Sequence, residues 1–113
     1  MENKVLYYSI QNKIKGNFGY KPCNMEITSD YFAFSQGSVL GVAVGGLVGY
    51  AISSGAHKKN GVTLIPLNEI TNVEMKKGFG TAMIYIQAVN RPQLTFACYS
   101  KKDMETIYNL LNK

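Results

Sequence analysis

Residues 81–111, TAMIYIQAVNRPQLTFACYSKKDMETIYNLL, decide the fold class. The first part is rich in β-branched and aromatic residues, and it divides into two β-prone pieces, 81–89 and 93–99, around a turn at 90–92. After Ser100 the period changes, because apolar residues recur at i, i+3, i+4 and i+7, which predicts an amphipathic helix. The members of this stripe are Met104, Ile107, Tyr108 and Leu111.

The predicted helix has a recognisable start. Ser100 is placed to be its N-cap, and Ser100-Lys101-Lys102-Asp103 resembles a capping box with Asp in the place of the usual Glu. We therefore expect the helix to begin directly after Ser100.

The chain upstream of this stretch continues the β pattern. Short runs of alternating or β-branched residues occupy 4–14, 25–28, 31–34, 62–65 and 69–75. Glycine-containing turns at 16–19 and 77–80 separate some of these runs. The sequence therefore predicts a mainly β protein of about seven strands, followed by one C-terminal helix.

Length and composition limit the organisation of the chain. With 113 residues, we expect a single domain over 1–113, because two independent cores would each be too small to fold unaided. Hydrophobic residues make up 46% of the chain and charged residues 17%, which allows a packed core and excludes a disordered tail.

The charge balance favours anionic partners. Lys and Arg number 12 against 7 Asp and Glu, which gives a formal net charge of +5. Arg91 is the only arginine, and the bidentate recognition of base edges prefers arginine, so sequence-specific nucleic-acid binding is disfavoured. The first eight residues lack the pattern of a secretory signal, so we expect a cytoplasmic protein in which Cys23 and Cys98 are reduced.

Residues 38–56 form an apolar, glycine-rich insertion, and no residue between Asp30 and Lys58 is charged. Three glycines recur every four residues, which would place them on one face of a helix and allow a second helix to approach closely. These glycines are Gly41, Gly45 and Gly49. The apolar side chains that we expect to contact a lipid or a partner are Val39, Leu40, Val42, Leu47, Val48 and Ile52.

The conformation of the insertion stays open at this point. A helix that crossed a bilayer once would separate the strands before residue 38 from those after residue 57, and one β domain would not form. The insertion must therefore leave the domain and return to it on the same side of any membrane. It is a helix packed on the domain's own sheet, an interfacial or re-entrant element, a hairpin that turns near residues 45–46, or an oligomer contact.

Three stretches resemble bacterial PH-like and GRAM-like domains, which belong to the pleckstrin-homology superfold. Residues 25–35, MEITSDYFAFS, resemble a strand pair of the family, and 65–74, IPLNEITNVE, is similar to its I-P-L-x-x-I-x-x-V-E segment. Residues 94–96 and the helix after Ser100 resemble its closing strand and helix. The resemblance covers about residues 20–112.

The resemblance implies a partly open barrel of about seven antiparallel strands in two near-orthogonal sheets, with the C-terminal helix plugging one end. Some bacterial members also have a glycine-rich apolar insertion ahead of the I-P-L segment. The chain departs from eukaryotic PH domains, because it lacks a Trp in the last helix and the Arg/Lys motif of tight phosphoinositide binders. This departure argues against inositol-lipid specificity.

The sequence contains no recognisable catalytic motif. The only histidine, His57, precedes Lys58 and Lys59 in what we expect to be a solvated loop, and no pair of carboxylates is identifiable as a general acid and base. One histidine and two cysteines do not make a zinc site of the usual type in one copy. We therefore expect a protein without catalysis, metal or cofactor, and the sequence identifies no small-molecule substrate.

The lysines suggest an anion-binding rim made by several loops. Adjacent lysines are usually only solubility charges, but near an anionic membrane each contributes about 1 kcal/mol. The lysines expected at this rim are Lys13, Lys15, Lys21, Lys58, Lys59, Lys76 and Lys77.

The rim and the apolar insertion together predict peripheral binding to an anionic membrane, at the inner face of the cell membrane. The alternative is a protein-interaction or homo-oligomerisation module that uses the Gly41/Gly45/Gly49 face. A third, weaker hypothesis is nonspecific nucleic-acid binding through the basic surface and exposed tyrosines.

Overall fold

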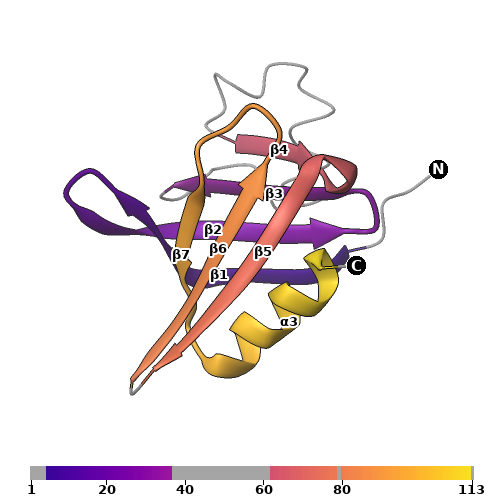
Figure 1. Ribbon diagram of the computed structural model, residues 1–113. Coiled ribbons are helices and arrows are strands. Elements are labelled where there is room, and N and C mark those ends of the chain that lie inside the picture. The colour runs from indigo at the N-terminus through magenta and orange to yellow at the C-terminus, as the bar shows by residue number, and fades with distance from the viewer. Residues whose placement is uncertain (1–4, 37–61, 79, 113) are drawn as a thin grey trace.

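The structure is a computed structural model that describes residues 5–36, 62–78 and 80–112. The described part is mainly β, with seven antiparallel strands and one helix (Figure 1). The elements are β1 (Val5–Gly16), β2 (Gly19–Thr28), β3 (Tyr31–Gln36), β4 (Val62–Pro66), the short 3-10 helix η1 (Leu67–Glu69), β5 (Ile70–Gly78), β6 (Thr81–Ala88), β7 (Leu94–Ala97) and α3 (Lys101–Leu111). The predicted order of strands followed by one closing helix is confirmed.

The strands form one continuous antiparallel sheet in the order β4-β3-β2-β1-β7-β6-β5. The sheet has two halves, β1–β4 and β5–β7. β1 joins them, because it pairs with β2 over most of its length and with β7 at two positions, Lys13↔Ala97 and Ile14↔Phe96. The end strands β4 and β5 are not neighbours in this order, so the sheet is not closed into a barrel. Figure 1 shows β5, β6 and β7 crossing the direction of β1–β4 steeply.

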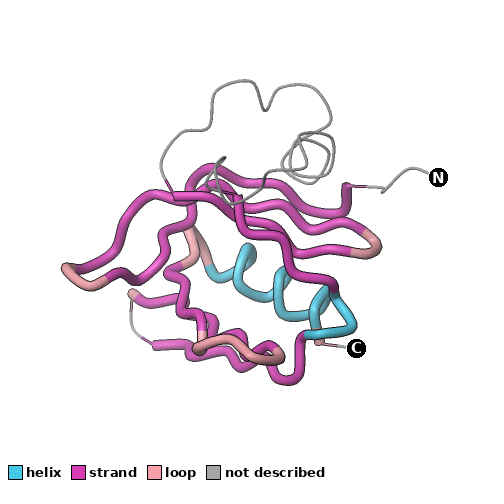
Figure 2. Tube along the Cα trace, turned by 90° about the horizontal axis from the view of Figure 1, so that it is seen from above, coloured by secondary structure: helices cyan, strands magenta, loops and turns pink. Residues whose placement is uncertain are grey.

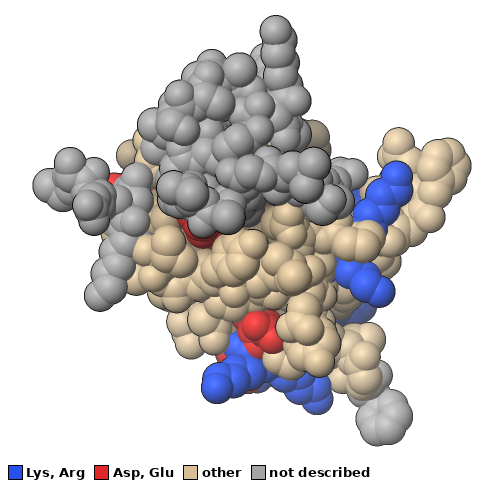
Figure 3. All heavy atoms as spheres, turned by 180° about the vertical axis from the view of Figure 1, so that it is seen from behind, with Lys and Arg blue, Asp and Glu red and all other residues tan. Residues whose placement is uncertain are grey.

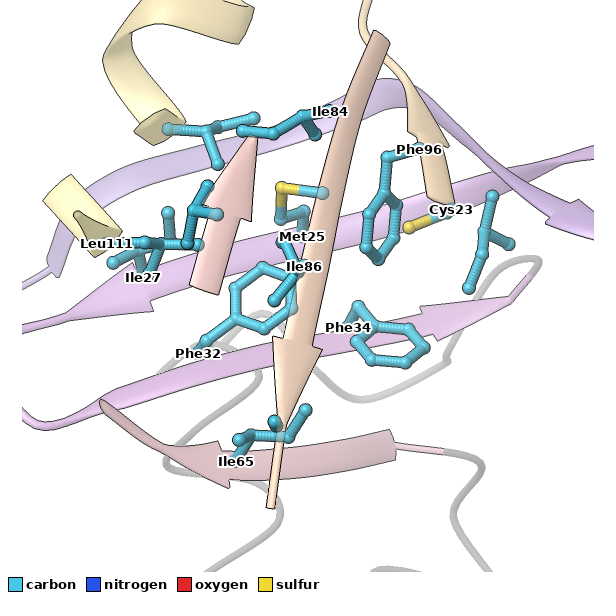
Figure 4. Close-up of a cluster of buried hydrophobic side chains, with 14 of the residues drawn as sticks. Cys23, Met25, Ile27, Phe32, Phe34, Ile65, Ile84, Ile86, Phe96 and Leu111 are labelled. Carbon is cyan, nitrogen blue, oxygen red and sulfur yellow. The ribbon is translucent and has the colours of Figure 1, made fainter. Parts of the chain in front are cut away.

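The core lies between these crossing strands and the helix. Side chains of β2, β3, β6 and β7 point toward one another there (Figure 4). Phe32, Phe34 and Phe96 form an aromatic cluster with ring centroids 5.4 to 5.7 Å apart, a favourable separation for tilted and edge-to-face rings. Met25 and Ile27 are fully buried beside it, so the two halves of the sheet share one core.

The helix packs on this core as its sequence period predicts. Met104, Ile107 and Leu111 are buried, and Tyr108 is partly buried. Figure 2 shows α3 lying between strands of the two halves of the sheet. Because the helix fills the space between the crossing strands, its apolar stripe completes the core.

The N-cap prediction is also confirmed. The Ser100 hydroxyl oxygen accepts a hydrogen bond from the Asp103 amide at 3.2 Å, and the same hydroxyl donates to Asp103 Oδ2 at 2.6 Å. Such a cap satisfies one of the free amides of the first turn and contributes about 1 kcal/mol.

The turns between strands follow local chemistry. Gly19 has φ +111°, a region that side chains rarely adopt, and it ends the two-residue turn between β1 and β2. Asn90 has φ 57° in the predicted turn between β6 and β7, and asparagine tolerates this conformation better than most residues. These two positions fix where the flanking strands reverse direction.

Candidate functional site

The β1–β2 hairpin extends beyond the rest of the sheet. The pairing of β1 with β7 stops at Ile14, and the pairing of β2 with β3 begins at Cys23. Residues 15–22 are therefore paired only within the hairpin, as Lys15↔Tyr20 and Gly16↔Gly19. In Figure 1 this two-stranded ribbon projects from the sheet at the left.

The end of the ribbon exposes a large aromatic side chain. Phe18 is 95% exposed, more than any other large hydrophobic residue of the described chain, and Tyr20 is 42% exposed. Neither ring contributes to the core, because both lie on the part of the ribbon beyond Cys23, where β2 no longer pairs with β3. The Tyr20 hydroxyl does lie 3.9 Å from Met83 Sδ on β6. A phenylalanine held in water at a turn gains nothing for folding, so it is a candidate contact residue.

Three lysines lie along the ribbon behind this aromatic end. Lys13, Lys15 and Lys21 are exposed. Cross-strand partners share a face of a sheet, so Lys15 and Tyr20 lie on one face, with Lys13 two residues away on that face. Lys21 pairs with Ile14 and lies on the other face. The ribbon therefore has positive charge on both faces behind an apolar tip, and we call these four residues, Lys13, Lys15, Phe18 and Lys21, the hairpin site.

Within the described chain, the hairpin lysines have no carboxylate partner. The only ion pair among the described residues joins Lys77 Nζ to Glu105 Oε2 at 2.9 Å, between β5 and α3. Both of those side chains are about half exposed, so the pair contributes little to stability. It does, however, neutralise one of the lysines that the sequence assigned to anion binding.

The other predicted lysines lie elsewhere. Lys76 pairs with Met83 and Lys77 with Ala82, so these neighbours point to opposite faces of β5. Seen from behind, the basic side chains gather at two separate places, one over the β1–β2 hairpin and one near the start of α3 and the end of β5 (Figure 3). The described chain thus brings together Lys13, Lys15 and Lys21 but not the pair on β5.

Several predicted site residues lie outside the described residues. They are the lysines Lys58 and Lys59, the glycines Gly41, Gly45 and Gly49, and the apolar side chains Val39, Leu40, Val42, Leu47, Val48 and Ile52. The predictions about them stay predictions.

A second exposed apolar row lies on β1. Leu6, Tyr8 and Ile10 alternate along the strand, so they share one face, and they are 41%, 50% and 60% exposed. β1 is irregular beside this row. Its register with β2 shifts between Ser9 and Asn12, and the Gln11 amide donates a hydrogen bond to Ser9 Oγ. A bulge of this kind discourages the addition of another strand.

Across residues 5–36, 62–78 and 80–112, no three His, Cys, Asp or Glu side chains gather as metal ligands would. In the same ranges, no helix combines the length and the apolar character needed to cross a bilayer.

No family model matches the chain, and no curated protein matches it either. Any function proposed for the chain therefore rests on its own residues.

Proposed function

We propose that the protein is a non-catalytic binding module that attaches to anionic membrane surfaces through the hairpin site. The observation that supports this is Phe18, which is 95% exposed at the end of a projecting ribbon and is flanked by exposed lysines. An aromatic side chain at the tip of a protrusion can enter the lipid interface while the body of the domain stays in water.

The two kinds of side chain supply two separate contributions. Burying a Phe side chain contributes about 1.5–3 kcal/mol, and each lysine near an anionic surface contributes about 1 kcal/mol. Either one alone gives marginal binding, whereas stable peripheral attachment takes two signals. The uncharged insertion at 38–56 would add further apolar contact on this proposal.

The hairpin also suggests an orientation. β2 has ten residues and would be about 33 Å long when extended, with the hairpin turn at one end and the β2–β3 turn at the other. If the tip meets the membrane, the β2–β3 turn faces away from it.

The proposal keeps the PH-like and GRAM-like assignment. Seven antiparallel strands, the steep crossing of β5–β7 over β1–β4 and a closing C-terminal helix are consistent with that superfold. A two-sheet, partly open barrel is the finer form of this proposal, and the β1–β2 hairpin would be one of the loops at its rim.

Vesicle co-sedimentation tests the function. We expect the protein to sediment with phosphatidylcholine vesicles that contain phosphatidylserine, to stay in solution with phosphatidylcholine alone, and to dissociate at high salt. Lys15→Gln/Lys21→Gln should weaken binding roughly 30-fold, from about 1 kcal/mol per lysine. Lys101→Gln/Lys102→Gln removes the same charge at the start of α3 and should have a much smaller effect.

A parallel titration distinguishes membrane binding from nucleic-acid binding. Lysines and exposed aromatic rings can also bind single-stranded DNA, so an oligonucleotide is titrated in parallel at low salt. Binding to the oligonucleotide without binding to anionic vesicles would replace the membrane proposal with the nucleic-acid one. Equal losses from the hairpin and the α3 lysine variants would show that only net charge matters and would reject the hairpin site.

A further inference from the structure

A second site lies at the opposite end of β2 from the hairpin. There the β2–β3 turn, the β4–η1 junction, the start of β5 and the end of α3 enclose a solvent-open pocket of about 540 Å³. This volume is within the range of small-molecule sites, about 300–1,000 Å³. Its apolar wall includes Leu67, Ile70 and Leu111, and its polar rim includes Asp30 and Asn68.

Asp30 is held in place by its backbone rather than its side chain. Its amide donates to Thr28 Oγ1 at 3.2 Å, and its carbonyl accepts from the Leu67 amide at 2.9 Å. Within the described chain, its carboxylate takes part in no hydrogen bond or ion pair. The pocket therefore presents a carboxylate on an anchored stretch of backbone, and its acceptor oxygens are available to a ligand.

The end of α3 adds negative potential at the same place. The helix ends at Leu111, which lines the pocket, and the last turn contains no basic residue that would offset the partial negative charge of its carbonyl groups. Among the described residues, one capping hydrogen bond forms at this helix end. The Asn112 amide donates it to the Tyr108 carbonyl. A carboxylate and a helix C-terminus both favour a cation, although the protein as a whole carries +5.

We propose that this pocket binds an organic ammonium group on an apolar stem. The ammonium would donate to Asp30 at the rim, and the stem would lie along Leu67, Ile70 and Leu111. Such a group occurs in a free arylalkylamine and in a lysine side chain of a peptide. The inference is independent of the membrane proposal, because the hairpin site and the pocket share no residue and lie at opposite ends of β2.

Amide NMR with 2-phenylethylamine as the probe tests this inference. We expect amide chemical-shift changes confined to the residues around the pocket, 29–31, 67–70 and 111. We also expect the amine to bind at least about tenfold more tightly than the neutral analogue 2-phenylethanol, because the alcohol cannot make the charge-assisted hydrogen bond. A parallel titration with a blocked Gly-Lys-Gly peptide distinguishes the two sources of the ammonium. Tighter binding of the amine assigns the site to small molecules, and tighter binding of the peptide assigns it to a lysine side chain.

Two variants and a control complete the experiment. Asp30→Asn keeps the size of the side chain and should remove the preference for amine over alcohol, while Asn68→Lys places a competing ammonium at the rim and should lower amine binding. Glu74→Gln removes one negative charge from an exposed position of β5 that does not line the pocket, four residues after Ile70, and should leave the preference unchanged. The inference is overturned if neither probe shifts the pocket residues, or if Asp30→Asn retains the preference.

Discussion

The Tyr7 hydroxyl donates a 2.8 Å hydrogen bond to Asp103 Oδ1 and so joins β1 to the first turn of α3, 96 residues further along the chain. Asn12 completes the connection, since its Nδ2 donates to the Tyr7 hydroxyl oxygen at 2.9 Å and its Oδ1 accepts from the Tyr99 amide at 2.9 Å. The strand that forms the projecting hairpin is thereby tied at its other end to the capped helix.

Asn12 is the central residue of this network, and its removal should cost stability. Its side chain is fully buried, and Asn12→Ala would leave the Tyr99 amide without its acceptor and the Tyr7 hydroxyl without one donor. We expect a loss of about 1–3 kcal/mol in the free energy of unfolding, measured by urea denaturation, because the Tyr99 amide is left without its acceptor. Exposed Gln11→Ala is the matched control, and a similar small change in both variants would contradict the assigned role.

Tyr7 should make stability depend on alkaline pH. Burial raises the pKa of its hydroxyl from 10.0 to about 12, the Asn12 hydrogen bond opposes the rise, and the Asp103 carboxylate adds to it. The folded state favours the neutral hydroxyl of Tyr7. Its contribution to the free energy of unfolding is therefore complete below about pH 10 and is lost as the pH rises through about 12.

Urea denaturation between about pH 8 and about pH 12 measures this effect. The decline in unfolding free energy over the upper part of that range should be less steep for Tyr7→Phe than for the wild type. Tyr8→Phe changes a half-exposed ring outside the network and should decline as the wild type does. Identical declines in all three proteins would refute the prediction for Tyr7.

The two cysteines should stay reduced and unreactive in the folded protein. Burial raises the pKa of each thiol from 9.0 to about 12, and smaller contributions come from Cys98 at Cys23 and from Asp103 at Cys98. Both are free, in agreement with the sequence expectation. Cys23 is on β2 and Cys98 directly follows β7, with β1 between the two strands, so their Cα atoms should be about 10 Å apart, beyond the roughly 7 Å limit of a disulfide.

Thiol labelling with a chromogenic disulfide reagent checks this. We expect slow labelling of the native protein, with Cys23 the slower of the two because it is 1% exposed, and rapid labelling of both in denaturant. Rapid native labelling, or an intramolecular disulfide after mild oxidation, would be inconsistent with the structure.

Local sequence patterns were sufficient for most elements but not for all. The period of Met104, Ile107 and Leu111 and the cap at Ser100 depend on neighbours a few residues away, so the helix could be located correctly. The first half of β2 could not, because Lys21-Pro22 has no β pattern and is extended only through its pairing with β1. The joining of the strands into one sheet depends on two residue pairs between distant strands, which leave no local signal.

The candidate site was likewise only partly predictable. The sequence placed Lys13, Lys15 and Lys21 near an anion because of their charge and their position beside a predicted turn. It assigned Phe18 only to that turn. Its exposure arises because the pairing of β1 and β2 continues beyond Ile14 and Cys23, where the neighbouring strands stop. The ion pair of Lys77 with Glu105 also depends on the packing of α3 against β5, which no local pattern predicts.

Phe18 should matter for binding and not for folding. Because it is 95% exposed, Phe18→Ser should change the free energy of unfolding by less than about 0.5 kcal/mol, yet it should weaken binding to anionic vesicles about tenfold or more. Ile10→Ser removes a 60% exposed apolar side chain from the body of β1 and is the matched control for vesicle binding. Equal losses of vesicle binding in the two variants would argue against a special role of the tip.

The most direct measurement uses the absence of tryptophan from the chain. Phe18→Trp introduces a single tryptophan at the tip of the hairpin, which can be excited apart from the tyrosines, and Ile10→Trp provides the same fluorophore on the body of β1. With phosphatidylserine-containing vesicles, we expect the emission of the Phe18→Trp variant to shift to the blue and to be quenched by brominated lipid, with neither change for the Ile10→Trp control. If the protein binds the vesicles while emission from the tip stays as it is in water, the hairpin does not enter the membrane and the central proposal is wrong.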